Sequence, residues 1–327
     1  MQKNILAKRI AAGFLAGLTA ASLLAGCGGG GGDKGSGAAN NPPKAETPAQ
    51  PARATVATAP SETFKIGDNE VKAYELTGVH LKDKLRTWGL ATIGDSVYFH
   101  IGVKPQHMAK VTVKNETLSD FTDLGEAGDV NAMASNGKVV VWKTKDSKAA
   151  IHDGKETKIG GKWPGDLAGI PGSDEFYVLR GGLLKVMKLE NGEFKDVREI
   201  SPDIRTKDLA DTRLSLVYGD KDTIYARCVL NKAGETKGTP VLVAFGTDGK
   251  EIRRYEGPTG GKRDFCVTES YVVYAGADGN IRVFDKKSGK TLGDAKVNFG
   301  PFALRAKTGN DVLAYDDRGK KLSRIDF

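Results

Sequence analysis

Cysteine, histidine and tryptophan are scarce in this chain. Its 327 residues include three Cys, four His and three Trp. The four histidines, His80, His100, His107 and His152, show no metal-ligand spacing such as HExxH. The sequence also has no GxSxG nucleophile elbow and no calcium loop of EF-hand spacing. We therefore expect no metal site, no cofactor and no local catalytic motif.

The apolar run at the N-terminus is too short to cross a bilayer as a helix. It extends from Ile10 to Leu24, about 15 residues, whereas a spanning helix needs about 20. Lys3, Lys8 and Arg9 precede this run, and small residues follow it. A basic start, a short apolar stretch and small residues are typical of a secretory signal that is removed after export.

The residues that end this run resemble the lipobox of bacterial lipoproteins. They read Leu23-Leu24-Ala25-Gly26-Cys27. The resemblance implies that residues 1–26 are cleaved as a signal peptide and that Cys27 is diacylated, and two acyl chains anchor a protein stably where one does not. Gly28 rather than Asp follows, which in this family implies the outer membrane of a diderm host, or the outer face of the cytoplasmic membrane in a monoderm one. The alternative is an ordinary signal peptide with a chance Cys.

The surface charge is mildly basic and well mixed. The formal net charge is +8, but three positive charges lie in the signal, which has no acidic residue. The mature chain has 46 Lys and Arg against 41 Asp and Glu, which leaves it near +5. Even mixing and export both argue against nucleic acid as a partner.

Residues 27–63 are predicted to form the lipidated Cys and a disordered tether. The stretch starts with five glycines after Cys27 and carries five prolines, no aromatic residue and one large aliphatic residue, Val56. Such a composition cannot bury enough apolar surface to offset the entropy of ordering. A flexible coil of this length reaches roughly 30–36 Å on average. The folded domain is predicted to extend over residues 64–327.

Internal repetition predicts the fold of that domain. A polar turn followed by apolar residues recurs six times, and the apolar pairs lie 42, 37, 48, 49 and 39 residues apart. These intervals suit a four-stranded propeller blade. The six segments are 94–98, 136–140, 173–177, 221–225, 269–274 and 309–313.

Further strands and turns complete each repeat. Alternating segments such as Ile281 to Phe284 follow, and then hairpin turns such as Asn191-Gly192. The last unit is one strand short, whereas Glu70 to Leu76 is a strand without a neighbour. Placing this strand in the last blade closes the ring and removes two exposed edges. The sequence thus predicts an all-β, six-bladed β-propeller closed by an N-terminal strand. A β-sandwich or a solenoid is the alternative.

One repeat resembles those of known propeller families. The segment from Gly279 to Leu292 is similar to a quinoprotein or WD-type repeat, because its strand ends in Asp285 and a Lys-Lys-Ser-Gly-Lys turn follows. The WD dipeptide and the stacked tryptophans of quinoprotein dehydrogenases are absent, which disfavours a quinone cofactor. In architecture alone, the whole resembles the propeller lipoprotein scaffold of the outer-membrane barrel-assembly machine, which has more blades.

Two cysteines remain in the predicted domain, Cys228 and Cys266. An exported compartment permits a disulfide between them. The alternative is two buried thiols in neighbouring strands. Sequence alone does not decide between these states, because it does not give the distance between the two Cα atoms.

Long loops on one face of the predicted ring combine basic and aromatic residues. These loops enter the innermost strands, and loops on a rigid scaffold often carry binding residues. We hypothesise a binding rim for an anionic or amphipathic partner. The alternative is that the aromatic rings pack under the loops and the charges are merely solvated. The rim is Arg86, Trp88, Lys162, Trp163, Lys262, Arg263 and Phe265.

These features together predict a non-enzymatic, lipid-anchored protein of the cell envelope whose propeller holds another envelope protein. The alternative is a propeller enzyme or carbohydrate-binding protein that acts on envelope or extracellular glycans. Catalytic residues in propellers converge from different blades and leave no local motif, so this alternative stays open.

Reversing the charge of Arg86, Lys162 and Arg263 together is predicted to abolish capture of the partner, because all three cations belong to the rim. Affinity capture with the wild-type and the triple variant measures this. Unchanged capture would contradict the rim hypothesis.

Overall fold

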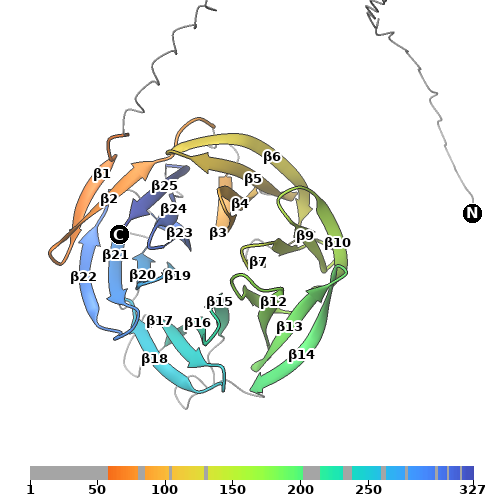
Figure 1. Ribbon diagram of the computed structural model, residues 1–327. Coiled ribbons are helices and arrows are strands. Elements are labelled where there is room, and N and C mark those ends of the chain that lie inside the picture. Colours follow the sequence, from red (N-terminus) through yellow and green to blue (C-terminus); the bar gives the residue numbers. More distant parts are fainter. Residues whose placement is uncertain are drawn as a thin grey trace, which may run out of the picture. The chain divides into compact units, whose positions relative to one another are not determined.

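The computed structural model describes residues 58–79, 85–102, 105–128, 132–201, 214–230, 238–258, 263–276, 279–298, 301–307, 309–316 and 319–327. Every regular element within these residues is a β-strand. The same residues contain no helix long and apolar enough to cross a membrane. The strands form six sheets arranged as blades around a central axis, so the predicted six-bladed, all-β propeller is confirmed (Figure 1). The predicted signal peptide, Cys27 and most of the predicted tether lie outside the described residues.

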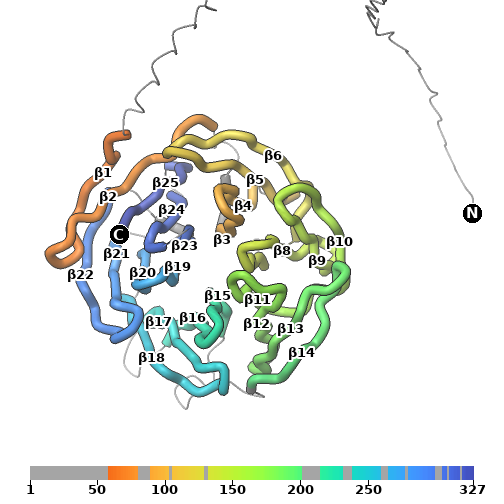
Figure 2. The backbone as a smooth tube through the Cα atoms, viewed as in Figure 1, coloured from red at the N-terminus to blue at the C-terminus, as the bar shows by residue number. Residues whose placement is uncertain are grey.

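Five of the blades have four strands, which follow one another from the axis outward (Figure 2). Blade 1 is β3 (Leu85–Ile93), β4 (Ser96–Ile101), β5 (Gln106–Lys114) and β6 (Thr117–Ala127). Blade 2 is β7 (Met133–Ser135), β8 (Val140–Lys143), β9 (Lys148–His152) and β10 (Thr157–Lys162). Blade 3 is β11 (Asp166–Gly169), β12 (Glu175–Arg180), β13 (Leu183–Glu190) and β14 (Glu193–Ser201).

The remaining blades complete the ring. Blade 4 is β15 (Ser215–Gly219), β16 (Thr223–Leu230), β17 (Thr239–Gly246) and β18 (Glu251–Glu256). Blade 5 is β19 (Arg263–Val267), β20 (Tyr271–Gly276), β21 (Asn280–Asp285) and β22 (Thr291–Lys296). Blade 6 has five strands, β23 (Pro301–Ala306), β24 (Val312–Asp316), β25 (Lys321–Asp326), β2 (Asn69–Glu75) and β1 (Glu62–Ile66).

The hydrophobic core consists of six clusters, each between two adjacent blades. In β4, Val97 and Phe99 pack against blade 6, whereas Tyr98 between them packs against blade 2. Both faces of such a strand are covered, so both must be apolar. This explains why the second strand of each repeat is a short apolar run instead of an alternating one.

The ring is closed by pairing the two ends of the domain. β2 runs antiparallel to β25, with Ala73 opposite Ile325 and Tyr74 opposite Arg324. The prediction that the N-terminal strand completes the last blade is therefore confirmed.

β1 was not predicted, and the folded domain begins at this strand, slightly before Phe64. It pairs with β2 through a hairpin at Gly67, where φ is +59°. A Cβ on Gly67 would come within 2.9 Å of the backbone oxygen of Leu292 in blade 5, so the turn requires glycine. The backbone N–H of Asn298 donates to the Glu62 carboxylate at 3.0 Å. β1 therefore extends blade 6 and also holds it against blade 5.

The repeated turns and the predicted hairpins lie at the same end of the ring. The repeated turns join the first and second strands of each blade, and the predicted hairpins join the third and fourth. Asn191 and Gly192 both have positive φ, 51° and 84°, as a type I′ turn requires. Asp153 and Asp248 instead cap their turns by accepting backbone N–H groups from residues two positions on, at 2.9 and 3.0 Å.

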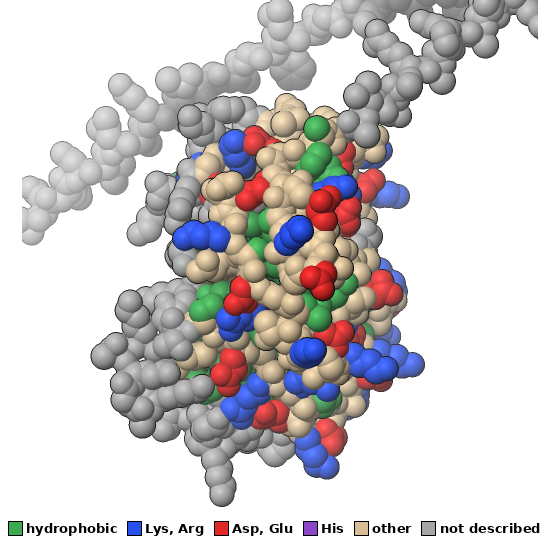
Figure 3. Space-filling view, turned by 90° about the vertical axis from the view of Figure 1, so that its left-hand side faces the viewer, with side chains coloured by type: hydrophobic (Ala, Val, Ile, Leu, Met, Phe, Trp, Pro, Cys, Tyr) green, Lys and Arg blue, Asp and Glu red, His purple; other side chains and the backbone are tan. Residues whose placement is uncertain are grey.

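The outer wall carries interspersed charges of both signs. Figure 3 shows Lys and Arg beside Asp and Glu on the side formed by β1, β2 and β22 in Figure 1. Charges of opposite sign also pair on the outer strands, as in Arg282 with Asp294 on the neighbouring strand at 2.6 Å and Arg254 with Glu251 on the same strand at 2.7 Å. This agrees with the evenly mixed surface that the sequence predicts.

Arg324 connects the closing blade to blade 1. Its guanidinium pairs with Glu116 at 2.6 Å and Asp311 at 3.1 Å, and it lies 4.7 Å from the centre of the Tyr74 ring. Glu116 is in the turn between β5 and β6 and has φ +59°, which is unusual for a residue with a side chain. These contacts fix the turn of blade 1 against the two strands that close the ring.

Replacing Arg324 with Met is expected to lower the free energy of unfolding by about 2 kcal/mol, because it leaves two partly buried carboxylates without their cation. Lys321→Met is the matched control, since its ion pair with Glu75 is exposed, and it should change stability by less than about 0.5 kcal/mol. Chemical denaturation measures both. Equal effects of the two variants would contradict the closing role of Arg324.

His152 is a buried histidine held in its neutral form. Its Nδ1 accepts the backbone N–H of Gly154 at 2.9 Å and lies 3.0 Å from the Tyr98 hydroxyl of blade 1. Burial lowers the pKa of His152, and Lys110 lowers it further. Burial also raises the pKa of Tyr98 to about 12, so this phenol stays protonated.

Stability should therefore decrease as the pH falls below about 6.5, where the unfolded histidine takes up a proton that the folded one does not bind. His152→Gln cannot be protonated, so its free energy of unfolding should fall less between about pH 7 and pH 5 than that of the wild type. Denaturant titrations across this range test the difference. An equally steep decline in the variant would assign the pH dependence to another group.

Candidate binding site in the central channel

A cavity of about 380 Å³ occupies the central channel at the end where the innermost strands finish. Its walls come from the last residues of these strands and from the turns that follow them. Every blade contributes to it. In blade order, the lining includes Thr92, Asn136, Pro171, Tyr218, Thr268 and Arg305.

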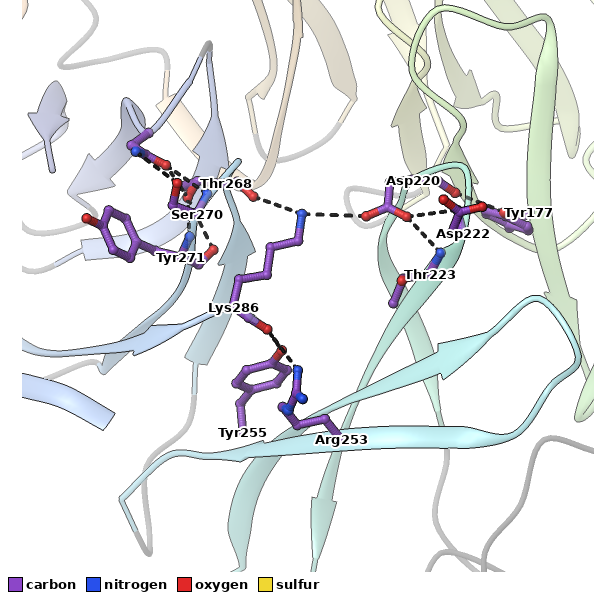
Figure 4. Close-up of polar contacts among 11 residues, drawn as sticks. Tyr177, Asp220, Asp222, Thr223, Arg253, Tyr255, Thr268, Ser270, Tyr271 and Lys286 are labelled. Carbon is purple, nitrogen blue, oxygen red and sulfur yellow. Dashed lines mark hydrogen bonds and ion pairs between the residues drawn. The ribbon is translucent and has the colours of Figure 1, made fainter. Parts of the chain in front are cut away.

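Lys286 forms part of the cavity wall between blades 4 and 5. It lies in the turn after β21, and its Nζ donates to the Thr268 carbonyl at 3.2 Å (Figure 4). The same amine is 3.5 Å from the Asp220 carboxylate and lies 5.7 and 5.8 Å from the ring centres of Tyr218 and Tyr225. Hydrogen bonding and cation–π contacts therefore hold this cation in place.

The groups around Lys286 are themselves fixed. Tyr255 and Arg253 donate to the backbone carbonyl of Lys286 at 2.7 and 3.1 Å, which secures the turn (Figure 4). Asp220 accepts the backbone N–H groups of Asp222 and Thr223 at 3.0 and 2.7 Å. The position of the Lys286 amine is thus set by contacts from both neighbouring blades.

Arg305 and Lys307 supply two further cations to the lining. Arg305 lies on β23 of blade 6, and its Nη1 donates at 3.3 Å to the carbonyl of Val217 on β15 of blade 4. Blade 5 stands between these two blades, so the side chain of Arg305 passes the inner edge of blade 5 to reach blade 4. The Nζ of Lys307 is 3.6 Å from Asp95 of blade 1.

Asp264 ties three blades together beneath the cavity. It forms an ion pair with Arg227 of blade 4 and accepts the backbone N–H of Leu304 in blade 6 at 3.2 Å. It also accepts the N–H of Phe265 at 3.1 Å. Burial raises the pKa of Asp264, while Arg227, the two backbone donors and the nearby Arg305 oppose that rise. Asp264 is thus engaged in contacts that hold blades 4, 5 and 6 together.

The thiol and phenol of the lining stay protonated at neutral pH. Burial raises the pKa of Cys266 to about 12, and burial likewise raises the pKa of Tyr218. The thiolate, not the thiol, is the reactive form of cysteine. The cavity therefore offers cations and hydrogen-bond donors rather than a nucleophile, and its chemistry suits the binding of an anion.

The described part of the predicted rim lies at the opposite end of the propeller from this cavity. Arg86 and Trp88 are in the first half of β3 and Arg263 begins β19, whereas Lys162 ends β10, the outermost strand of blade 2, and Trp163 follows it. Lys162 is exposed, whereas Trp163 packs against the core between blades 2 and 3. Lys262 and the side chains of Arg86, Trp88 and Arg263 lie outside the described residues.

Phe265 is a correction to the predicted rim. Its side chain is 1% exposed and packs in the core between blades 4 and 5. The alternation of β19 turns this ring toward the core, which could not be read from its position next to basic residues.

Cys228 and Cys266 are buried thiols in β16 and β19, and they do not form the disulfide that the sequence left open. The two strands belong to different blades and do not pair with each other. Of the two alternatives, the structure has the buried thiols.

Sequence reasoning missed Lys286, Arg305 and Lys307. The turn that contains Lys286 was recognised as part of a repeat, but its partner Asp220 lies 66 positions earlier in the chain. Aligning the six repeats would have placed Arg305 and Lys307 at the channel end of an innermost strand. An alignment of the repeats was therefore the sequence feature that could have indicated a cationic site.

No family model and no curated protein matches the chain. Solved β-propellers do match. The WD40 repeats of RRP9 superimpose with a TM-score of 0.50 and 11% identity, covering 81% of this chain and 99% of that one. The WD40 β-propeller domain of Doa1 gives 0.45 and 14%, covering 81% and 95%. The designed protein Ika8 gives 0.43 and 13%, covering 76% and 99%. The likeness to RRP9 shows the propeller fold alone.

Proposed function

We propose that this chain is a lipid-anchored protein of the bacterial cell envelope whose propeller binds another envelope protein. In a diderm host the proposed location is the outer membrane. The observation that carries the binding role is the chemical character of the central cavity. Its cations are held in place by structural contacts, while its thiol and phenol stay protonated.

This character favours binding over catalysis. A general base or nucleophile works best when its pKa lies near the operating pH. Burial moves Cys266 and Tyr218 away from that range, because it raises the pKa of both. Fixed cations and donors, by contrast, suit the recognition of a complementary surface, for which a preorganised site loses little entropy on binding.

The anchoring part of the proposal rests on the sequence from Leu23 to Cys27. Two acyl chains on Cys27 would hold the protein at a membrane. Residues 28–61 then separate the lipid from β1, the first strand of the propeller. A tether of that length lets the ring reach partners within a few tens of ångströms of the membrane.

Affinity capture tests the proposal, using the full lipidated chain with an epitope tag after Phe327 and detergent-solubilised envelopes. One or a few envelope proteins should copurify in stoichiometric amounts, because a scaffold holds its partner specifically. The Cys27→Ser chain is the matched control, because it cannot carry acyl chains at this position.

A clean preparation without partners would contradict the scaffold role. Thermal unfolding with envelope polysaccharides then tests the glycan alternative, since a ligand that binds only the folded state raises the melting temperature. Mass spectrometry that finds Cys27 without acyl chains in the wild-type protein would contradict lipid anchoring separately.

A further inference from the structure

Arg305 differs from the other cations that line the cavity. Lys286 is close to Asp220, and Lys307 is close to Asp95, each on a neighbouring blade. Among the described residues, Arg305 forms no ion pair, and its guanidinium makes one hydrogen bond, to the Val217 carbonyl. A guanidinium has five N–H donors. Most of the donor capacity of Arg305 is therefore available inside the channel.

The hydrogen-bond donors of Arg305 are relevant to ligand binding because of where the side chain lies. The residue is half-buried, and its side chain reaches past blade 5 from blade 6 to blade 4. It lies close enough to Tyr218 and Cys266 to oppose the rise in their pKa that burial causes. Charged hydrogen bonds are stronger in such partly dry surroundings than in water.

The rest of the lining favours an anion. Of the described residues around the cavity, three are cationic and only Glu269 is acidic. Pro171, Val217 and Leu304 add apolar surface to the walls. A planar guanidinium matches a carboxylate in a two-point hydrogen bond, which a lysine amine cannot provide.

We propose that this cavity is a carboxylate-binding site in which Arg305 grips the carboxylate and Lys286 and Lys307 add positive potential. A volume of about 380 Å³ holds a small organic acid or one to two acidic side chains of a protein segment. Both sources present the same chemistry to Arg305. This inference rests on the proposed binding function and names the chemistry that the same cavity would recognise.

Isothermal titration calorimetry of the full lipidated chain in detergent tests the site with two probes, succinate and a tetraglutamate peptide. Succinate represents a free dicarboxylate, and tetraglutamate represents an acidic protein segment. At least one should bind the wild type. Arg305→Gln, which keeps a donor for the Val217 carbonyl but loses the charge, should weaken that binding at least about tenfold.

Arg254→Gln is the matched control. It removes the same charge from an exterior ion pair with Glu251, away from the cavity, and should bind the probe like the wild type. Arg305→Lys keeps the charge and a donor, so it provides a second variant should Arg305→Gln not fold. It should bind several-fold more weakly than the wild type, because lysine cannot make the two-point contact.

The two probes distinguish the two possible ligands. Binding of tetraglutamate alone identifies an acidic protein segment as the ligand, and binding of succinate identifies a small acid. The proposal is overturned if neither probe binds the wild type, or if folded Arg305 variants bind as tightly as the wild type. Captured partners together with silent titrations would leave the scaffold role standing and remove only the carboxylate site.

Discussion

The pairing of β2 with β25 is the constraint on which the rest of the structure depends. Each blade buries both faces of its inner strands against two neighbours, so the cluster between the first and last blades forms only when the ring is closed. A six-bladed ring of separate sheets has no hydrogen bonds that join its first blade to its last. Here the pairing of β2 with β25 supplies that connection. The ion pairs of Arg324 and the contact of β1 with blade 5 reinforce it.

Ring closure also creates the binding cavity. Six innermost strands converge at one end of the channel, and each contributes residues to a space that no single blade encloses. The contacts that hold its cations cross between blades, as Lys286 does toward Asp220 and Arg305 toward Val217. The interactions that stabilise the ring at this end are therefore the same ones that orient the charges of the cavity.

Repetition made the fold predictable, whereas the site depended on contacts that repetition does not encode. The number of blades, the turns and the closing strand follow from patterns that recur along the chain. β1 escaped prediction because a single hairpin at Gly67 has no counterpart in other repeats. Phe265 was misplaced because adjacency to Arg263 says nothing about which face of β19 its ring occupies. The three cations of the cavity escaped because they lie in or next to different strands of blades 5 and 6, and no local sequence pattern shows that these positions face the same channel.

The energetic cost of burying a charge explains why Arg305 indicates a ligand. A half-buried cation without a counter-charge costs stability, since burial removes water that would otherwise solvate it. Lys286 and Lys307 offset that cost with nearby carboxylates, and Asp264 is already committed to Arg227. Among the described residues, Arg305 forms one hydrogen bond, to the Val217 carbonyl, and its closest acidic influence is Asp264, with which it forms no ion pair. Proteins keep such locally unfavourable groups mainly where binding or activity needs them. A carboxylate that enters the channel would give Arg305 a counter-charge in direct contact, and this ion pair would contribute to binding.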